Sequence, residues 1–400
     1  MTTLTQILFF VAVIGVAYVY FGYPLVVLIL SMARPRPVYR KTITPLVTLL
    51  IAAYNEAECI AATIENKLGL DYPKDQLEII VVSDGSTDGT DEIVRRYAGE
   101  SVRLIRQEPR AGKTSALNLA VSHANGEILV FSDANSSYAP DALRFLVENF
   151  NDPKVGYVTG KMIYTNPDGS PVGDGCTAYM KYENFLRAAE TRVGSVVGVD
   201  GGIDAVRKLL YRPMNPDQLP DFVLPLKVVE QGFRVIYESR ALLREQALSQ
   251  AEDEYRMRVR VSLRALWALS DMRHLLTFSR SLSYSSGTPS HLLTFAPSFL
   301  YSWQLWSHKV LRYLSFLFLT AAFFSNLALW GEGMSYKLAL LIQIAAYLSA
   351  IAAPLLERFR VQFKLIHMAR YFVLLNLASA YAFFKFLCGK KQVVWEPRKG

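Results

Sequence analysis

Cysteine and histidine are both scarce in this chain. Its three cysteines, Cys59, Cys176 and Cys388, are far apart and show no paired spacing. Such an arrangement predicts neither a disulfide framework nor a cysteine zinc site. The five histidines are dispersed in the same way, so the sequence gives no sign of a histidine nucleophile or of a histidine metal cluster.

A complete phosphate-binding P-loop is also missing. The tetrapeptide 111–114 reads Ala-Gly-Lys-Thr, which looks like the end of that motif. A P-loop needs a second glycine five positions before Gly112, and Gln107 stands there instead. The tetrapeptide also does not follow the first predicted strand. Both observations argue against a P-loop nucleotide hydrolase.

Charged residues are absent from a long run near the N-terminus, residues 7–32. This length is enough to cross a hydrocarbon core of about 30 Å. A cleaved signal peptide fits poorly, because a basic start and a small-residue cleavage site are missing. Three further candidate spans are 310–330, 337–356 and 366–387, the last of which contains Arg370 and Lys385. The apolar segment 292–306 is interrupted by Pro297 and is predicted to be an interfacial helix.

The positions of basic residues predict the orientation in the membrane. Four of them follow the first span directly, namely Arg34, Arg36, Arg40 and Lys41. Basic residues favour the cytoplasmic side, so the middle of the chain is expected there and the N-terminus outside. The tail conflicts with this scheme, because four crossings would place Lys390, Lys391, Arg398 and Lys399 outside. The net charge of +8 is attributed to this topology and to anionic lipid headgroups, and no nucleic-acid partner is expected.

The middle of the chain predicts a doubly wound α/β domain. Its apolar runs do not alternate with polar residues, as is typical of parallel strands buried on both faces. The predicted strands are 46–53, 78–83, 102–106, 127–132 and 155–159. The predicted helices are 56–68, 90–97, 113–122 and 141–150.

Polar side chains follow three of these strands at the point where each ends. The cluster Tyr54-Asn55-Glu56 follows the first strand, Asp84 the second and Asp133 the fourth. In doubly wound sheets, ligands bind beyond the carboxyl ends of the strands. The three clusters are therefore expected to converge on one crevice.

Two later motifs complete a resemblance to a known family. Asp221 lies in the segment Leu-Pro-Asp-Phe at 219–222, and an arginine run follows at Arg256, Arg258 and Arg260. In order and spacing the whole set resembles the membrane-embedded family 2 glycosyltransferases, which include cellulose, chitin, hyaluronan and poly-N-acetylglucosamine synthases. The resemblance implies a nucleotide-sugar transferase domain of GT-A type inserted between transmembrane helices. The expected parts are 1–40 (first span), 41–250 (transferase domain), 251–308 (arginine motif and interfacial helices) and 309–400 (C-terminal spans and tail).

The resemblance also implies roles on the donor side. Ala53, Tyr54, Asn55 and Glu56 are expected to contact the nucleoside together with Asp84, and Lys113 is expected near the diphosphate. Asp133 matches the first acid of a DxD element and is expected to bind Mg²⁺ or Mn²⁺ with phosphate oxygens. Asn135 replaces the second acid, and its amide oxygen either binds the same metal or caps the loop. Asp88 is predicted to cap the helix that follows it.

On the acceptor side, Asp221 is the expected general base, although Pro220 replaces the glutamate that usually precedes it. Arg258 and Arg260 match the two arginines of the family's last motif, in which Val261 stands at the tryptophan position. Trp267 either takes over the role of that tryptophan or anchors an interfacial helix. Arg256 and Arg264 are predicted to contact lipid headgroups, and the segment 199–207 resembles the family's acceptor-side strand.

The expected activity is inverting transfer of a sugar from a UDP-sugar to a growing β-linked polysaccharide that is secreted. One alternative is transfer of a single sugar to a lipid or short glycan acceptor, and another is an inactive membrane scaffold. The implied partners are the UDP-sugar, a glycan or lipid-linked acceptor, membrane lipids, and export or accessory proteins. The expected location is the plasma (inner) membrane, with several crossings and a cytoplasmic catalytic domain.

Overall fold

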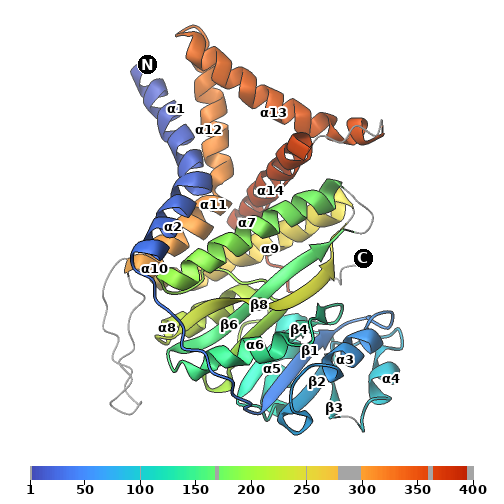
Figure 1. The fold of residues 1–400 in the computed structure, drawn as a ribbon. Helices are drawn as coiled ribbons and strands as arrows, with labels where there is room; N and C mark the ends of the chain where they lie inside the picture. Colours follow the sequence, from blue (N-terminus) through green and yellow to red (C-terminus); the bar gives the residue numbers. More distant parts are fainter. Residues whose placement is uncertain are drawn as a thin grey trace.

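The computed structural model describes residues 2–99, 101–166, 171–248, 250–277, 299–358 and 364–393. An α/β domain forms one end of the molecule, and the helices α1 (Thr2–Ala17), α12 (Ser315–Ala328), α13 (Met334–Arg358) and α14 (Lys364–Leu387) form the other (Figure 1). The first part of the expected interfacial helix, 292–298, lies outside the described residues, as do Arg398 and Lys399 of the tail.

The α/β domain is built on one sheet in the order β3-β2-β1-β4-β7-β6-β8-β5. Four neighbouring strands are parallel, and each begins or ends within a residue of its predicted bounds: β1 (Val47–Ala53), β2 (Leu77–Ser83), β3 (Val102–Arg106) and β4 (Ile128–Asp133). Residues Leu49 and Ile51 of β1 pack into the core on one face of the sheet, and Leu50 and Ala52 into the core on the other. This two-sided burial explains the apolar runs in the sequence.

The other half of the sheet contains both parallel and antiparallel pairs, whereas the sequence predicted parallel strands. β7 (Ile203–Arg207) runs antiparallel to β4 and to β6 (Val155–Thr165). β8 (Arg234–Gln246) is parallel to β6, and the short β5 (Ser137–Tyr138) is antiparallel to β8. β7 therefore brings its residues against the end of β4 from the opposite direction, which matters for the site.

The predicted helices of the α/β domain are present but mostly shorter. They are α3 (Ile60–Leu68), α4 (Thr90–Arg95), α5 (Lys113–His123) and α6 (Ala142–Glu148). The largest difference is in α3, which begins four residues later than predicted. Its expected first turn is instead bonded to the loop after β2. Asp88 does not occupy the N-cap position of α4, where Gly89 lies with φ 94°, but its carboxylate accepts a bond from the N–H of Thr90 at 3.1 Å.

Three helices lie around the mixed half of the sheet. α7 (Pro171–Val193) packs on β6 and β8 and also contacts α2 (Tyr23–Ala33) and α14. α8 (Pro220–Glu230) begins with Pro220 in its first turn and packs on β8. α9 (Ala251–Asp271) lies between the sheet and the membrane-end helices and makes extensive contacts with α14 (Figure 1).

Among the described residues, two helical segments are long and apolar enough to cross a membrane, Thr2–Ala33 and Met334–Ala352. A third span results if the bent pair Phe299–Tyr313 and Ser315–Ala328 counts as one, with a bend of 57° between its members. Within the described residues, α14 does not meet the same criteria of length and hydropathy. The four membrane spans that the sequence suggested therefore reduce to two or three. α1 and α12 pack closely at Gly15, where a Cβ would lie only 2.9 Å from the ring of Phe318.

Candidate active site

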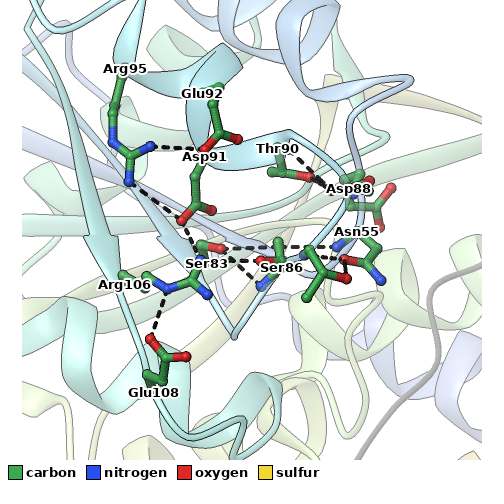
Figure 2. Close-up of polar contacts among 12 residues, drawn as sticks. Asn55, Ser83, Ser86, Asp88, Thr90, Asp91, Glu92, Arg95, Arg106 and Glu108 are labelled. Carbon is green, nitrogen blue, oxygen red and sulfur yellow. Dashed lines mark hydrogen bonds and ion pairs between the residues drawn. The ribbon is translucent and has the colours of Figure 1, made fainter.

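The loops after β1 and β2 are bonded to each other at the carboxyl edge of the sheet. The N–H of Asp84 donates to Ala53 O at 2.9 Å, so the two strand ends are in register. Asn55 has a positive φ of 54°, its N–H donates to Ser86 Oγ at 3.1 Å, and its Oδ1 accepts from the N–H of Thr87 at 2.8 Å. Figure 2 shows these contacts and the neighbouring hydrogen bond that Thr90 Oγ1 donates to Asp88 Oδ1. These bonds replace the predicted first helical turn.

Asp84 is fully buried and organises the loop that leads to α5. Its Oδ1 accepts from Gln107 Nε2 at 2.5 Å and from the N–H of Ala111 at 2.8 Å. Its Oδ2 accepts from the N–H of Gly112 at 2.9 Å. A carboxylate has about four acceptor positions, and three are used here. Asp84 thus holds the 107–112 loop in place, and its nucleoside contact stays a prediction.

Tyr54 lies under a cation. The guanidinium of Arg110 stacks 3.4 Å from the centre of the Tyr54 ring, and Arg110 Nε lies 3.7 Å from Asp84 Oδ2. Glu56 follows, with its N–H donating to Thr90 Oγ1 at 2.9 Å. Two of the predicted nucleoside residues, Tyr54 and Asp84, therefore meet at Arg110, which sequence reasoning did not single out. The signal in the sequence that could have indicated Arg110 is its place two positions before Gly112, in the loop that leads to α5.

Lys113, Asp133 and Asp221 form the charged centre of the site. Lys113 begins α5 and donates from Nζ to Asp133 Oδ1 at the end of β4. Burial alone would lower the pKa of Lys113, but the carboxylates of Asp133 and Asp221 raise it overall. Burial raises the pKa of Asp221 and Asp133 adds to this, while Lys113 and Arg264 oppose it. A half-buried carboxyl with a raised pKa is suited to accept a proton.

The predicted metal ligands offer a minimal set of oxygens. The side chain of Asp133 is one-third exposed, and Asn135 lies two residues further on the same loop. Among the described residues no three His, Cys, Asp or Glu side chains gather in a metal-binding group. Mg²⁺ sites in nucleotide enzymes are usually made of one or two protein oxygens plus substrate phosphates. The residues present fit a metal of that kind, held jointly with a diphosphate.

A pocket opens beside these groups, with about 360 Å³ of empty space when open solvent is included, and a further acid lines it. Lys113, Tyr157, Asp204 and Asp221 line it together with apolar side chains. Asp204, on β7, is buried, and its Oδ1 has no hydrogen-bond partner within the described part of the chain. Burial raises its pKa to about 7, and the carboxylates of Asp200 and Asp221 add to the effect. Sequence reasoning missed Asp204 because it lies within a strand and not after one.

Gly201 sets the distance between β7 and Asp221. Its φ is +85°, in the left-handed region that favours glycine. A Cβ there would lie 2.7 Å from the Cβ of Asp221, so the turn before β7 rests directly on the start of α8. This close approach places the acids of β7 and α8 in one pocket.

The arginines of α9 point to two different places. Arg260 lies on the side of Lys113, whose pKa it lowers, and Arg264 lies one turn further. Arg264 is buried and donates to Thr114 Oγ1 at 2.9 Å and to the carbonyl of Gln218, so it fixes the loop before Asp221. The prediction that Arg264 contacts lipid headgroups is therefore wrong. Arg258 instead bonds Glu254 at 2.8 Å and Tyr371 Oη at 2.8 Å. Residues two apart on a helix do not share a face.

Trp267 is held against the end of α14. Its ring lies 4.7 Å from that of Phe386, its Nε1 donates to Lys390 O at 2.8 Å, and Lys391 Nζ lies 4.8 Å from its centre. Lys391 also bonds Asp217 at 2.5 Å. Trp267 therefore anchors the chain that follows α14, while the exposed Arg256 pairs with Glu252 on its own helix.

The α/β domain, with a lysine at the start of α5 and acids at the ends of β2 and β4, has the arrangement expected of GT-A glycosyltransferases. A fold comparison agrees with this class. The structure of a mannosyltransferase from Pyrobaculum calidifontis, in complex with GDP-Man and Mn²⁺, superposes with a TM-score of 0.65 at 24% identity. The superposition covers 93% of this chain and 98% of that one.

Sequence comparison points to one family. Residues 48–199, which lie in the α/β domain, match Glycosyl transferase family 2. A poly-beta-1,6-N-acetyl-D-glucosamine synthase of Staphylococcus aureus (strain COL) is 30% identical over 203 residues, which are 49% of this chain and 48% of that protein. The synthase of the same name from Staphylococcus epidermidis is 26% identical over 281 residues, 69% of this chain and 66% of that protein. The match thus spans about half the length of the first relative.

Proposed function

We propose that this chain is an inverting glycosyltransferase that moves a sugar from a UDP-sugar to an acceptor at the membrane. The observation that supports this most is the convergence of Lys113, Asp133 and Asp221 beside one pocket at the carboxyl edge of the sheet. A cation for the diphosphate and a carboxyl with a raised pKa are the groups that such a transfer needs.

On the donor side, the nucleoside would lie over Tyr54 and the loop that Asp84 holds. The diphosphate would lie at the start of α5, where Lys113 supplies a cation and the helix N-terminus favours an anion. Arg260, on the same side of α9, would add a second cation. The ammonium group of Lys113 donates a hydrogen bond to Asp133, so both side chains would lie beside the diphosphate.

In the reaction, the Asp221 carboxylate would take the proton from the acceptor hydroxyl. The acceptor oxygen forms a bond to the anomeric carbon of the sugar while the bond from that carbon to the diphosphate oxygen breaks. UDP leaves with the bonding electrons, and the proton stays on Asp221. Attack opposite to the leaving group inverts the anomeric centre. Lys113 and Arg260 would stabilise the charge that develops on the diphosphate.

Asp133 and the amide oxygen of Asn135 would hold Mg²⁺ or Mn²⁺. When bound, the metal would neutralise charge on the leaving diphosphate. Because Asn135 brings no charge, weaker metal binding is expected than at a site with two acids.

For the acceptor, the names of the curated relatives support a growing β-linked polysaccharide, with N-acetylglucosamine as the first sugar to test. One observation favours the single-transfer version instead. Val261, at the position of the family's tryptophan, lines a cavity with basic residues and has no aromatic face for stacking a glycan. Both versions share the donor chemistry described above.

The location we propose is the plasma (inner) membrane with the catalytic domain in the cytoplasm. The contacts of Lys390 with Trp267 and of Lys391 with Asp217 support a tail on the catalytic side. An even number of crossings between Ala33 and Lys390 follows from such a tail, which the bent pair and Met334–Ala352 would supply. This arrangement removes the conflict with the basic residues of the tail.

The test is a transfer assay on the full chain in lipid. A panel of radiolabelled UDP-sugars, with GDP-mannose included, is incubated with the enzyme and the products are sized. We expect one UDP-sugar to give a product and the Asp221→Asn variant to give little. Preference for GDP-mannose would overturn the assignment of the donor, and no transfer from any donor would favour the scaffold.

A further inference from the structure

A second cavity lies where α9 meets the helices of the membrane end, and its empty space, open solvent included, is about 550 Å³. Three cationic side chains line it: Arg258 of α9, Lys309 of the helical turn Trp306–Val310 (η6), and Arg312 of α11 (Leu311–Tyr313). Tyrosines and α14 side chains complete the wall, and no carboxylate of the described residues faces the cavity. A buried space with this lining is suited to an anion.

The three cations differ in how well their charge is met. Arg258 is bonded to Glu254 at 2.8 Å, and Arg312 is bonded to Glu183. Lys309 is paired more weakly. Its Nζ lies 4.0 Å from Glu183 Oε2, so it shares that carboxylate with Arg312, and its ammonium makes no hydrogen bond within the described part of the chain.

Lys309 is nevertheless largely enclosed, with only 13% of its side chain exposed. A buried ammonium group costs free energy unless a hydrogen-bonded counter-charge is present. His308, the preceding residue, supplies no counter-charge, because it bonds Glu190 at 2.6 Å through Nδ1 and its Nε2 lies 3.4 Å from Glu183. Because one carboxylate is shared by two cations, a hydrogen-bonded counter-charge for Lys309 is expected to come from a ligand in the cavity.

The surroundings of the cavity indicate that this ligand is an amphiphile. Lys309 and Arg312 belong to the bent pair of helices that the chain presents as a candidate span. Tyr20, also in the wall, belongs to the candidate span Thr2–Ala33. Large apolar side chains of these spans, such as Phe21 and Phe324, are exposed on their outer faces. An anion with a hydrocarbon tail would be held by both surfaces.

We propose that this cavity binds the phosphate group of a lipid-linked acceptor, with Lys309 as its main donor and Arg312 and Arg258 behind it. The proposal rests on the proposed function in one respect, namely that the bound lipid carries the acceptor hydroxyl. It applies whether one sugar or many are then added.

The path from the cavity to the base is short. Lys309 Nζ lies over Gly198, since a Cβ at that position would overlap it. Gly201, three residues later, rests on Asp221. Three residues span at most about 11 Å of chain, so the head of a lipid-linked glycan bound at Lys309 would reach Asp221.

The test measures binding to the full chain in detergent micelles by fluorescence titration, without any UDP-sugar. The probes are a short polyprenyl phosphate, the matching neutral polyprenol and inorganic phosphate. We expect the polyprenyl phosphate to bind at least tenfold more tightly than the polyprenol. Inorganic phosphate should compete only weakly, which distinguishes a lipid headgroup from a free anion.

Four variants locate the binding. Lys309→Met should weaken binding of the polyprenyl phosphate by roughly 10- to 100-fold, as expected for loss of a charged hydrogen bond. Lys309→Arg should retain most of it, and Gly198→Ala should weaken it by displacing the lysine without removing charge. Lys337→Met is the control, because Lys337 lies on α13, 5.7 Å from the ring of Trp330 and away from the cavity wall.

Equal binding of polyprenol and polyprenyl phosphate would overturn the proposal, and so would equal effects of Lys309→Met and Lys337→Met. Competition by inorganic phosphate at the concentrations at which the lipid binds would show a free-anion site instead. UDP titration of the same samples separates the two claims. If UDP fails to bind while the polyprenyl phosphate binds through Lys309, the proposed function fails and the lipid site stands.

Discussion

Asp204 gives the sharpest prediction about stability. The carboxyl is fully enclosed between β4 and β6, and its pKa is raised from 3.8 to about 7, first by burial and then by Asp200 and Asp221. In the unfolded chain the group ionises near its ordinary value. The folded protein therefore keeps a proton that the unfolded chain releases between about pH 4 and pH 7.

The sign follows from this difference. The unfolded state binds fewer protons in that range, so the contribution of Asp204 to stability falls as the pH rises and levels off above about pH 7. A shift of about three pH units at about 1.4 kcal/mol per unit gives a loss of ~4 kcal/mol in total. About 2.5 kcal/mol of it falls between pH 5 and pH 8.

The variant Asp204→Asn has no proton to lose and should escape this decline. Its Tm relative to the wild type should rise by about 5–10 °C between pH 5 and pH 8, for a domain of some 200 residues. Thermal unfolding of both proteins in the same detergent measures the difference. Asp75→Asn, at an exposed position, is the control and should show no such change. A variant whose Tm difference from the wild type is the same at both pH values would refute the reasoning.

Four further predictions concern the activity and topology. UDP binding measured by calorimetry should require Mg²⁺ or Mn²⁺ and weaken strongly in Asp133→Ala, and equal affinity in EDTA would rule out the metal role. Asp221→Asn should keep UDP-sugar binding but lower turnover by roughly 10²–10⁴-fold, and undiminished turnover would move the base elsewhere. Sizing of the radiolabelled products should show a ladder if a polymer is made, whereas a product with a single added sugar would leave only the lipid or short glycan acceptor. Reporter fusions should place Arg40 and Gln250 in the cytoplasm and the N-terminus outside, and a cytoplasmic N-terminus would reverse the orientation.

Sequence patterns predicted the parallel half of the sheet well for a physical reason. Strands buried on both faces must be apolar throughout, so β1, β2 and β4 are visible as uninterrupted runs. The antiparallel direction of β7 was not visible, because direction depends on where the connecting chain turns back. Residues 160–165 extend β6 past its predicted end. This extension pairs with the long β8 after a register shift near Gly160. Pairing of this kind leaves little periodic signal.

The candidate site divides in the same way. Asp84, Lys113 and Asp133 follow strand ends or begin a helix, and residues in these positions can be found from the order of elements alone. Asp204 and Arg264 lie within a strand and within a helix, where a charged residue most often faces solvent. Only the three-dimensional packing shows that both are buried beside Asp221.

α9 explains why one sequence motif serves two places. Positions 258 and 260 are separated by more than half a helical turn, so Arg258 and Arg260 cannot both reach one diphosphate. Arg260 and Arg264 are four residues apart and lie together on the side of Lys113 and Asp221. Arg258 and Ser262 are likewise four apart and face the cavity at Lys309. The two faces of the helix therefore serve two different places, the centre at Lys113 and Asp221 and the cavity at Lys309, and a substitution on either face is expected to affect one place more than the other.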